Sequence, residues 1–199
     1  THGRGFYVLE NIAPLRQFDP AQAAGPFHLY TPKGVYREQY PAQIDFLVAK
    51  ETTGARLDIL DPTGGVLRQI ALPGTLAAGH HRTEWNLRGA GATVFPGMVL
   101  EAPSPARGVR VPPGEYQARL TVDGVSQTVR FEVQPDPRRT TTPAEYASQY
   151  ALAVRVRDAA SKANEAVIRI REITRTLPAG SELAAKLTAV EGELYQIKN

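Results

Sequence analysis

The sequence predicts a mainly β protein with an α-helical tail, in which an antiparallel β-sandwich precedes a helical hairpin. Before residue 140, glycine and proline recur every few residues, and apolar residues alternate with polar ones as they do along strands. From Pro143 to Asn199 the apolar residues step by three or four, the period of an α-helix. Only Pro178, Gly180 and Gly192 interrupt this second pattern. The change in period marks the boundary between a β region and a helical region.

Composition excludes several classes of protein. The 199 residues are 42% hydrophobic, which is enough to bury one large core or two small ones. No apolar run approaches the ~20 residues of a membrane span, so none is expected. The net charge of +3 is small and dispersed, which does not favour a nucleic-acid partner. Cysteine is absent, which excludes disulfides, Cys-ligated zinc and thiol nucleophiles.

Six or seven short antiparallel strands are expected in the β region, as in a β-sandwich. The apolar alternation covers residues 27–31, 43–49, 57–59, 66–72, 83–87, 116–122 and 125–133. Asp123-Gly124 is a strong hairpin signal, because a type I′ turn needs positive φ at both central residues. Trp85 alternates with polar neighbours and is predicted to be a core residue. A further apolar strand is expected at 5–12.

Gly89 to Pro113 is a long insertion rich in glycine and proline, and we expect it to pack against the protein or to be partly mobile. After it, Thr142, Pro143 and Glu145 form a predicted capping box that starts a helix. Two apolar stripes follow. The first comprises Leu152, Val156, Ala160, Ala163, Val167, Ile170, Thr174 and Leu177, and the second Leu183, Leu187, Val190, Leu194 and Ile197.

The second helix can cover only about half of the first in an antiparallel hairpin. The uncovered half carries Tyr146, Tyr150 and Val154, which are therefore predicted to form an interaction surface. This row is expected to rest on the sandwich or on an upstream domain, with self-association of the chain as the alternative.

No catalytic, cofactor or metal site is predicted. His80 and His81 are adjacent on a strand and point to opposite faces, so they do not form a metal-binding pair. Four carboxylates alternate with apolar residues and are predicted to lie on the wet face of a sheet rather than to act as a glycosidase pair. They are Asp45, Glu51, Asp58 and Asp61. Basic residues 155–175 are interleaved with acidic ones, which predicts a solvated, self-paired helix face.

The N-terminal segment Thr1-His2-Gly3-Arg4-Gly5-Phe6-Tyr7-Val8-Leu9, followed by Ile12-Ala13-Pro14-Leu15, resembles the end of large bacterial propeller proteins. These are the BNR/Asp-box or VPS10 (sortilin)-like proteins, which are often called glycosyl hydrolases. Later segments resemble their C-terminal region in the same order. They are Leu57-Asp58-Ile59-Leu60-Asp61, Thr83-Glu84-Trp85-Asn86-Leu87-Arg88, Phe95-Pro96-Gly97-Met98, Pro112-Pro113-Gly114-Glu115-Tyr116 and Pro135-Asp136-Pro137-Arg138.

The resemblance implies an immunoglobulin-like domain of the FlgD type and then a helical tail. The expected divisions are a propeller remnant and linker at 1–26, the sandwich at 27–137 and the hairpin at 138–199. The propeller would lie upstream, and a chain that begins at Thr1 is expected to be a fragment or a processed product. No Asp-box occurs here, so the family's catalytic residues cannot be carried onto any position of this chain.

The resulting hypothesis is a non-catalytic accessory module of a secreted or periplasmic propeller protein, which packs against that propeller or another partner. The alternative is a carbohydrate-binding module, for which Tyr30, Tyr36 and Tyr40 are the only aromatic cluster. A third hypothesis is that residues 89–113 contribute to the cleft of an active hydrolase.

Overall fold

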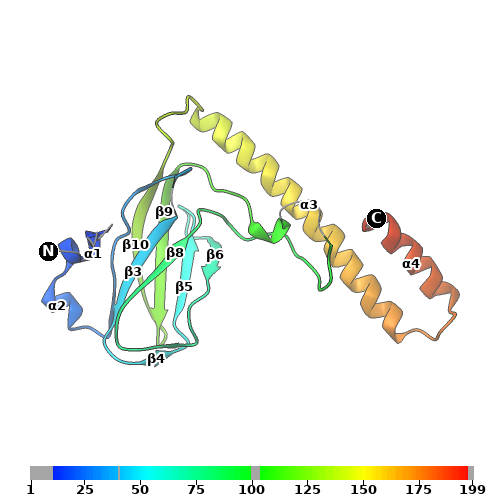
Figure 1. The fold of residues 1–199 in the computed structure, drawn as a ribbon, viewed down its shortest axis with the longest axis horizontal. Helices are drawn as coiled ribbons and strands as arrows, with labels where there is room; N and C mark the ends of the chain where they lie inside the picture. The colour runs from blue at the N-terminus through cyan, green and yellow to red at the C-terminus, as the bar shows by residue number, and fades with distance from the viewer. Residues whose placement is uncertain (1–10, 40, 100–103, 197–199) are drawn as a thin grey trace, which may run out of the picture. The chain divides into compact units, whose positions relative to one another are not determined.

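The computed structural model describes residues 11–39, 41–99 and 104–196. The chain divides into two compact units (Figure 1). The β unit comprises Thr1–Leu87 and Pro112–Thr140, and the helical unit comprises Arg88–Val111 and Thr141–Asn199. Each unit is therefore built from two segments that are distant in sequence.

Two sheets form the sandwich of the β unit. The first has the order β1 (Phe27–Leu29), β3 (Ala42–Val48), β8 (Gly79–Trp85). The second has the order β2 (Val35–Tyr36), β10 (Val125–Gln134), β9 (Gly114–Val122), β5 (Arg56–Leu60), β6 (Val66–Ile70). Strand pairs are antiparallel except for β2, which runs parallel to β10. A short ribbon joins β4 (Thr52–Thr53) and β7 (Thr75–Leu76).

This topology confirms the predicted immunoglobulin-like sandwich. Lettered in chain order, the first sheet is A-B-E and the second carries G-F-C-C′, which is the immunoglobulin arrangement. Tyr116, near the start of β9, donates its hydroxyl to the carbonyl oxygen of Pro112 at 2.8 Å. That bond has the form of the tyrosine corner found at this position of such sandwiches.

Trp85 lies in the centre of the core, as predicted. Its side chain is 0% exposed and contacts the rings of Tyr116 and Phe131 at centroid distances of 5.5 and 5.9 Å. The predicted hairpin turn is also present between β9 and β10, where Asp123 and Gly124 have φ values of 50° and 79°. These two features fix the register of the longest strand pair against the core.

The prediction that the carboxylates lie on a wet sheet face is wrong for Asp45 and Asp58, which are buried. Arg56 Nε and Arg119 Nη2 donate to the two oxygens of Asp58 at 2.8 and 2.9 Å. Alternation does not anticipate this burial because long arginine side chains, from the same strand for Arg56 and from neighbouring strands for Arg82 and Arg119, cover the outer face. Glu51 is exposed, and Asp61 is half-buried and accepts hydrogen bonds within its own turn.

Two short helices, α1 (Ala13–Gln17) and α2 (Pro20–Ala23), precede the first strand. Of the strand expected at 5–12, residues 5–10 lie outside the described part of the chain. Asn11 and Ile12 are not in a strand.

The hairpin of the helical unit consists of α3 (Pro143–Thr176) and α4 (Glu182–Leu194). The predicted capping box is formed: the Glu145 amide donates to Thr142 Oγ1 at 3.3 Å, and the Thr142 amide donates to Glu145 Oε2 at 2.7 Å. Arg171 Nε donates to Glu191 Oε1 at 2.8 Å and joins the C-terminal half of α3 to α4.

The predicted apolar stripes are only partly correct. Val167 and Ile170 are buried, but Leu152 and Val156 are 58% and 61% exposed. On α4, the side turned away from solvent carries half-buried Ala184, Leu187, Glu191 and Tyr195, while three predicted stripe residues are exposed. They are Leu183, Val190 and Leu194. Ile197 lies outside the described residues.

Residues 88–111, the crossover between β8 and β9, explain the changed face of α3. Thr93 is the main contact: its carbonyl oxygen accepts from Asn164 Nδ2 at 2.6 Å, and its amide donates to Ser161 Oγ at 3.1 Å. Phe95 is buried between Tyr195, whose ring meets it edge-on, and the Arg171 guanidinium. The crossover thus belongs to the helical unit, although the sequence placed it within the 27–137 sandwich.

Candidate functional site

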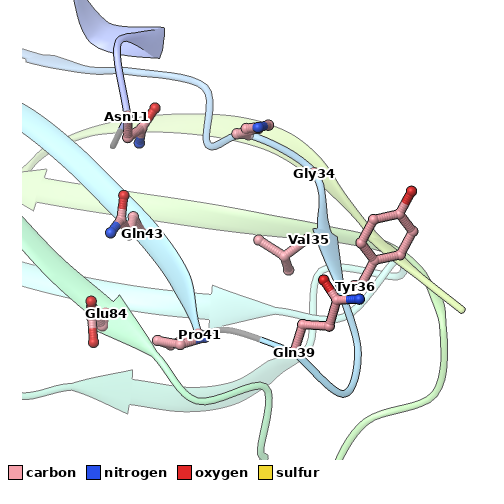
Figure 2. Close-up of a pocket in the computed structure, with 9 residues that line it drawn as sticks. Asn11, Gly34, Val35, Tyr36, Gln39, Pro41, Gln43 and Glu84 are labelled. Carbon is pink, nitrogen blue, oxygen red and sulfur yellow. The ribbon is translucent and has the colours of Figure 1, made fainter. Parts of the chain in front are cut away.

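A pocket of about 510 Å³ opens on the β unit and is the candidate site (Figure 2). Its volume lies within the usual range for small-molecule sites. It is lined by Asn11, Lys33, Gly34, Val35, Tyr36, Gln39, Pro41, Gln43 and Glu84.

Strand pairing positions the two walls of this pocket. Gln43 on β3 and Glu84 on β8 are register partners, so their side chains leave the first sheet side by side. The opposite wall is the segment around β2, which is held against β10 by the parallel pairing of Val35 with Val133. Figure 2 shows Val35 directed into the hollow and the Tyr36 ring directed away from Gln43 and Glu84. Tyr36 therefore lies at the rim.

The lining favours binding through hydrogen bonds. Asn11, Gln39 and Gln43 supply amide groups that both donate and accept, Glu84 supplies a carboxylate and Lys33 an ammonium group. These groups suit a ligand with many hydroxyls. The lining includes one carboxylate, whereas glycoside hydrolysis uses a pair.

A buried carboxylate lies next to this pocket and anchors one of its residues. Asp45 Oδ1 accepts from Arg82 Nε at 2.7 Å and lies 3.0 Å from His80 Nε2, while Oδ2 accepts from Asn11 Nδ2 at 3.4 Å. Burial, and secondarily the negative charge of Asp45, raises the pKa of Tyr30 above its usual value. The Asp45 network therefore ties the segment at Asn11 to strands β3 and β8.

The two adjacent histidines contact different partners. His81 stacks on Phe46 with a centroid distance of 5.4 Å, and its Nε2 lies 2.8 Å from the carbonyl oxygen of Ala77. Within the described residues, no group of three or more potential ligands could hold a metal ion.

The predicted row of stacking aromatics is not assembled as an exposed platform. Tyr30 is only 5% exposed and contacts His28 edge-on, so its ring offers no face to a sugar. Tyr36 is 40% exposed at the pocket rim. Tyr40 lies outside the described residues. The polar lining was missed because no motif links it: Asn11, the 33–41 segment, Gln43 and Glu84 come together only through strand pairing.

On the helical unit, the predicted interaction row is partly buried. Tyr146 is buried at 5% exposure, and Tyr150 and Val154 are half-buried. Sequence reasoning placed Leu152 and Val156 in the packed stripe, yet they are the exposed apolar residues of the N-terminal half of α3. The one sequence feature that distinguishes the covered face of α3 from the exposed one is the polar Asn164, which lies on the face that the crossover covers.

Comparisons with known proteins yielded similarities of fold alone. No protein-family profile matches the chain, and no curated protein matches it. Among solved structures, FlgD from P. aeruginosa is 18% identical, with a TM-score of 0.35 over 52% of this chain and 67% of that one. CopC from Methylosinus trichosporium OB3b is 12% identical, with a TM-score of 0.31 over 58% of this chain and 99% of that one.

Among the described residues, neither α3 nor any shorter helix has an apolar stretch that could cross a membrane.

Proposed function

We propose that this chain is a non-catalytic accessory module of a secreted β-propeller protein, and that its helical unit presents an interaction surface. The observation that carries the proposal is the construction of that unit. A 34-residue helix is braced along one face by the crossover and along its C-terminal half by α4, and still exposes apolar side chains. Exposed apolar groups on a braced helix suit docking to a protein partner.

The propeller is proposed as the partner because the N-terminal residues resemble the closing segment of propeller proteins. The accessible part of the predicted row, half-buried Tyr150 and Val154, would supply the contact beside the buried Tyr146. Tyrosine is enriched at such interfaces because its ring adds large contact area with few rotatable bonds.

The proposal can be tested by producing the segment that precedes Thr1 in the parent protein and this chain as separate polypeptides. Calorimetry should detect their association, and Tyr150→Glu should weaken it by about tenfold or more, the effect of losing a well-packed interface tyrosine. Tyr36→Glu on the β unit is the matched control and should leave the affinity unchanged. No association between the wild-type polypeptides would refute the proposal.

Carbohydrate binding is the second candidate, and the polar pocket is the observation that favours it. The amides of Asn11, Gln39 and Gln43 and the Glu84 carboxylate offer several hydrogen-bonding groups within one hollow. Soluble oligosaccharides should then shift the backbone NMR signals of residues 33–43. Gln43→Ala should abolish the shift, whereas Gln117→Ala, a half-buried glutamine on β9, should not. Absence of any shift with a broad set of oligosaccharides would exclude this candidate.

A further inference from the structure

The helical unit carries two separate apolar rows that its own folding does not cover. On α3, Leu152, Val156, Ala159 and Ala163 follow each other at spacings of four, three and four residues, and the first two are 58% and 61% exposed. On α4, Leu183, Val190 and Leu194 are exposed, and half-buried Leu187 lies between them, which gives the same spacings of four, three and four residues. Leu183, Val190 and Leu194 are 52%, 50% and 43% exposed. Such spacing is that of the contact seam between paired helices.

The two rows match in length. Leu152 to Ala163 on α3 and Leu183 to Leu194 on α4 are both separated by 11 residues, which at 1.5 Å per residue is about 16 Å. The row on α3 lies N-terminal to Arg171, the residue that pairs with α4 of the same chain. Each chain thus offers one exposed apolar row on the N-terminal half of α3 and a second on α4.

The charges beside the two rows are complementary. Arg155, Lys162 and Arg169 lie seven residues apart along one edge of the α3 row and are exposed. None of the three forms an ion pair with a residue that the structure describes. Beside the α4 row, Glu182 and Glu193 directly precede Leu183 and Leu194. Glu193 likewise has no ion pair within the described residues, and Glu182 pairs only with Lys186, at 2.6 Å.

We propose that two copies of this chain associate through these rows, with α4 of each copy packed on the N-terminal half of α3 of the other. The contact is reciprocal, so it closes into a symmetric dimer. It places the basic edge of α3 beside the glutamates of α4, whereas an α3–α3 contact would bring basic edges together. An anionic lipid surface fits less well, because each of the three basic residues is followed three positions later by an acidic one, which an anionic surface would repel. The acidic residues are Asp158, Glu165 and Glu172.

The inference deepens the proposed role as an interaction module but uses a different surface from the row Tyr146, Tyr150 and Val154. It also accounts for α4 itself. A 13-residue helix that contains Gly192 is marginal on its own and gains stability from apolar contacts on a second face.

Sedimentation equilibrium of the full chain over a range of concentrations tests the proposal. Wild-type protein should show a monomer–dimer equilibrium, and Val156→Glu should shift it to monomer. Val125→Glu is the matched control, because Val125 is 59% exposed on the β unit, close to the 61% of Val156. The Val125→Glu variant should dimerise as the wild type does. A wild-type chain that stays monomeric throughout would overturn the proposal.

Charge reversal gives a sharper test. In a dimer of the variant Arg155→Glu/Lys162→Glu, the acidic edge of α3 would lie beside the glutamates of α4. In a dimer of the variant Glu182→Lys/Glu193→Lys, the lysines of α4 would lie beside the basic edge of α3. Like charges repel in both cases, so each variant should be monomeric alone. When the two are mixed, both reciprocal contacts become complementary and a heterodimer should form. Circular dichroism checks that each variant remains helical. Two folded variants that fail to pair would contradict the proposed contact, while binding of the upstream segment is measured separately.

Discussion

Trp85 illustrates how one side chain organises the β unit. It is fully buried on β8 and touches Tyr116 and Phe131 from the opposite sheet. Trp85→Ala should lower the free energy of unfolding by about 3–5 kcal/mol, because it removes a large apolar side chain and leaves a cavity. Urea unfolding followed by circular dichroism measures the loss. Val66→Ala, at a 51% exposed position, is the control and should cost far less. A loss from Trp85→Ala as small as the control's would contradict its core role.

Asp136, in the turn that follows β10, holds an ionised carboxylate through hydrogen bonds from Arg138. Arg138 donates to both of its oxygens, with Nη2 to Oδ2 at 2.6 Å, and its backbone amide donates to Oδ1 at 3.0 Å. These bonds lower the pKa of Asp136 from 3.8 to about 2. A lowered pKa means that the ionised carboxylate stabilises the folded state above pH 3.8 and that this contribution is lost as the pH falls towards 2.

Asp136→Asn should therefore reduce stability at neutral pH, and the difference from wild type should shrink between pH 3.8 and about 2. Urea titrations of both proteins across this range measure it. Asp19→Asn, at an exposed position whose carboxylate accepts from the backbone amide of Ala21, is the control. A wild-type-to-variant difference that does not change with pH would show that the Arg138 contacts contribute nothing.

At the scale of elements, the start of α3 depends on its capping box. Thr142 and Glu145 satisfy each other's backbone amides. The Thr142 amide, and secondarily its hydroxyl, donates to the Glu145 carboxylate and lowers the pKa of Glu145. Thr142→Ala should destabilise the first turn by about 1 kcal/mol, because a helix-terminal amide loses its acceptor. Hydrogen exchange of amides 143–147 should then accelerate, whereas Thr141→Ala should leave it unchanged. Equal exchange in both variants would show that the cap is not stabilising.

The path of the crossover depends on the close approach of its two backbone arms. A Cβ on Gly91 would lie 2.1 Å from the carbonyl oxygen of Ala106, so no larger residue fits while the two arms keep their positions. The sequence indicated only a long insertion rich in glycine and proline between Gly89 and Pro113. It contained no sign of the second arm, which comes from the other end of the same insertion.

At the scale of the whole molecule, Asn164 connects segments that are 71 residues apart by donating to the carbonyl oxygen of Thr93. Asn164→Ala should release the crossover from α3, because that carbonyl loses its partner. Amide exchange should accelerate at 89–98 and remain slow at 116–122. Glu172→Ala, an exposed position on the same helix, should have no such effect. Slow exchange of the crossover in Asn164→Ala would contradict this role.

The sequence by itself determined the local features of this protein. Period-two alternation located the longer strands but not the two-residue strands β2, β4 and β7. Asp123-Gly124 located the hairpin, and Thr142 with Glu145 located the start of α3 to the residue. Each is decided by neighbours in the chain, through side-chain direction, positive φ or a capping hydrogen bond. The same locality made Trp85 recognisable as a core residue.

Only the tertiary structure decided which faces are covered and where a pocket forms. Leu152 and Val156 match a packed helical stripe by spacing, but the crossover covers the Asn164 side instead. Asp45 and Asp58 are predicted to be solvated, but arginines from their own and from neighbouring strands enclose them. The pocket joins Asn11, Gln43 and Glu84 through strand register. Burial depends on segments distant in sequence, and periodicity within one segment carries no information about which distant segment will lie against it.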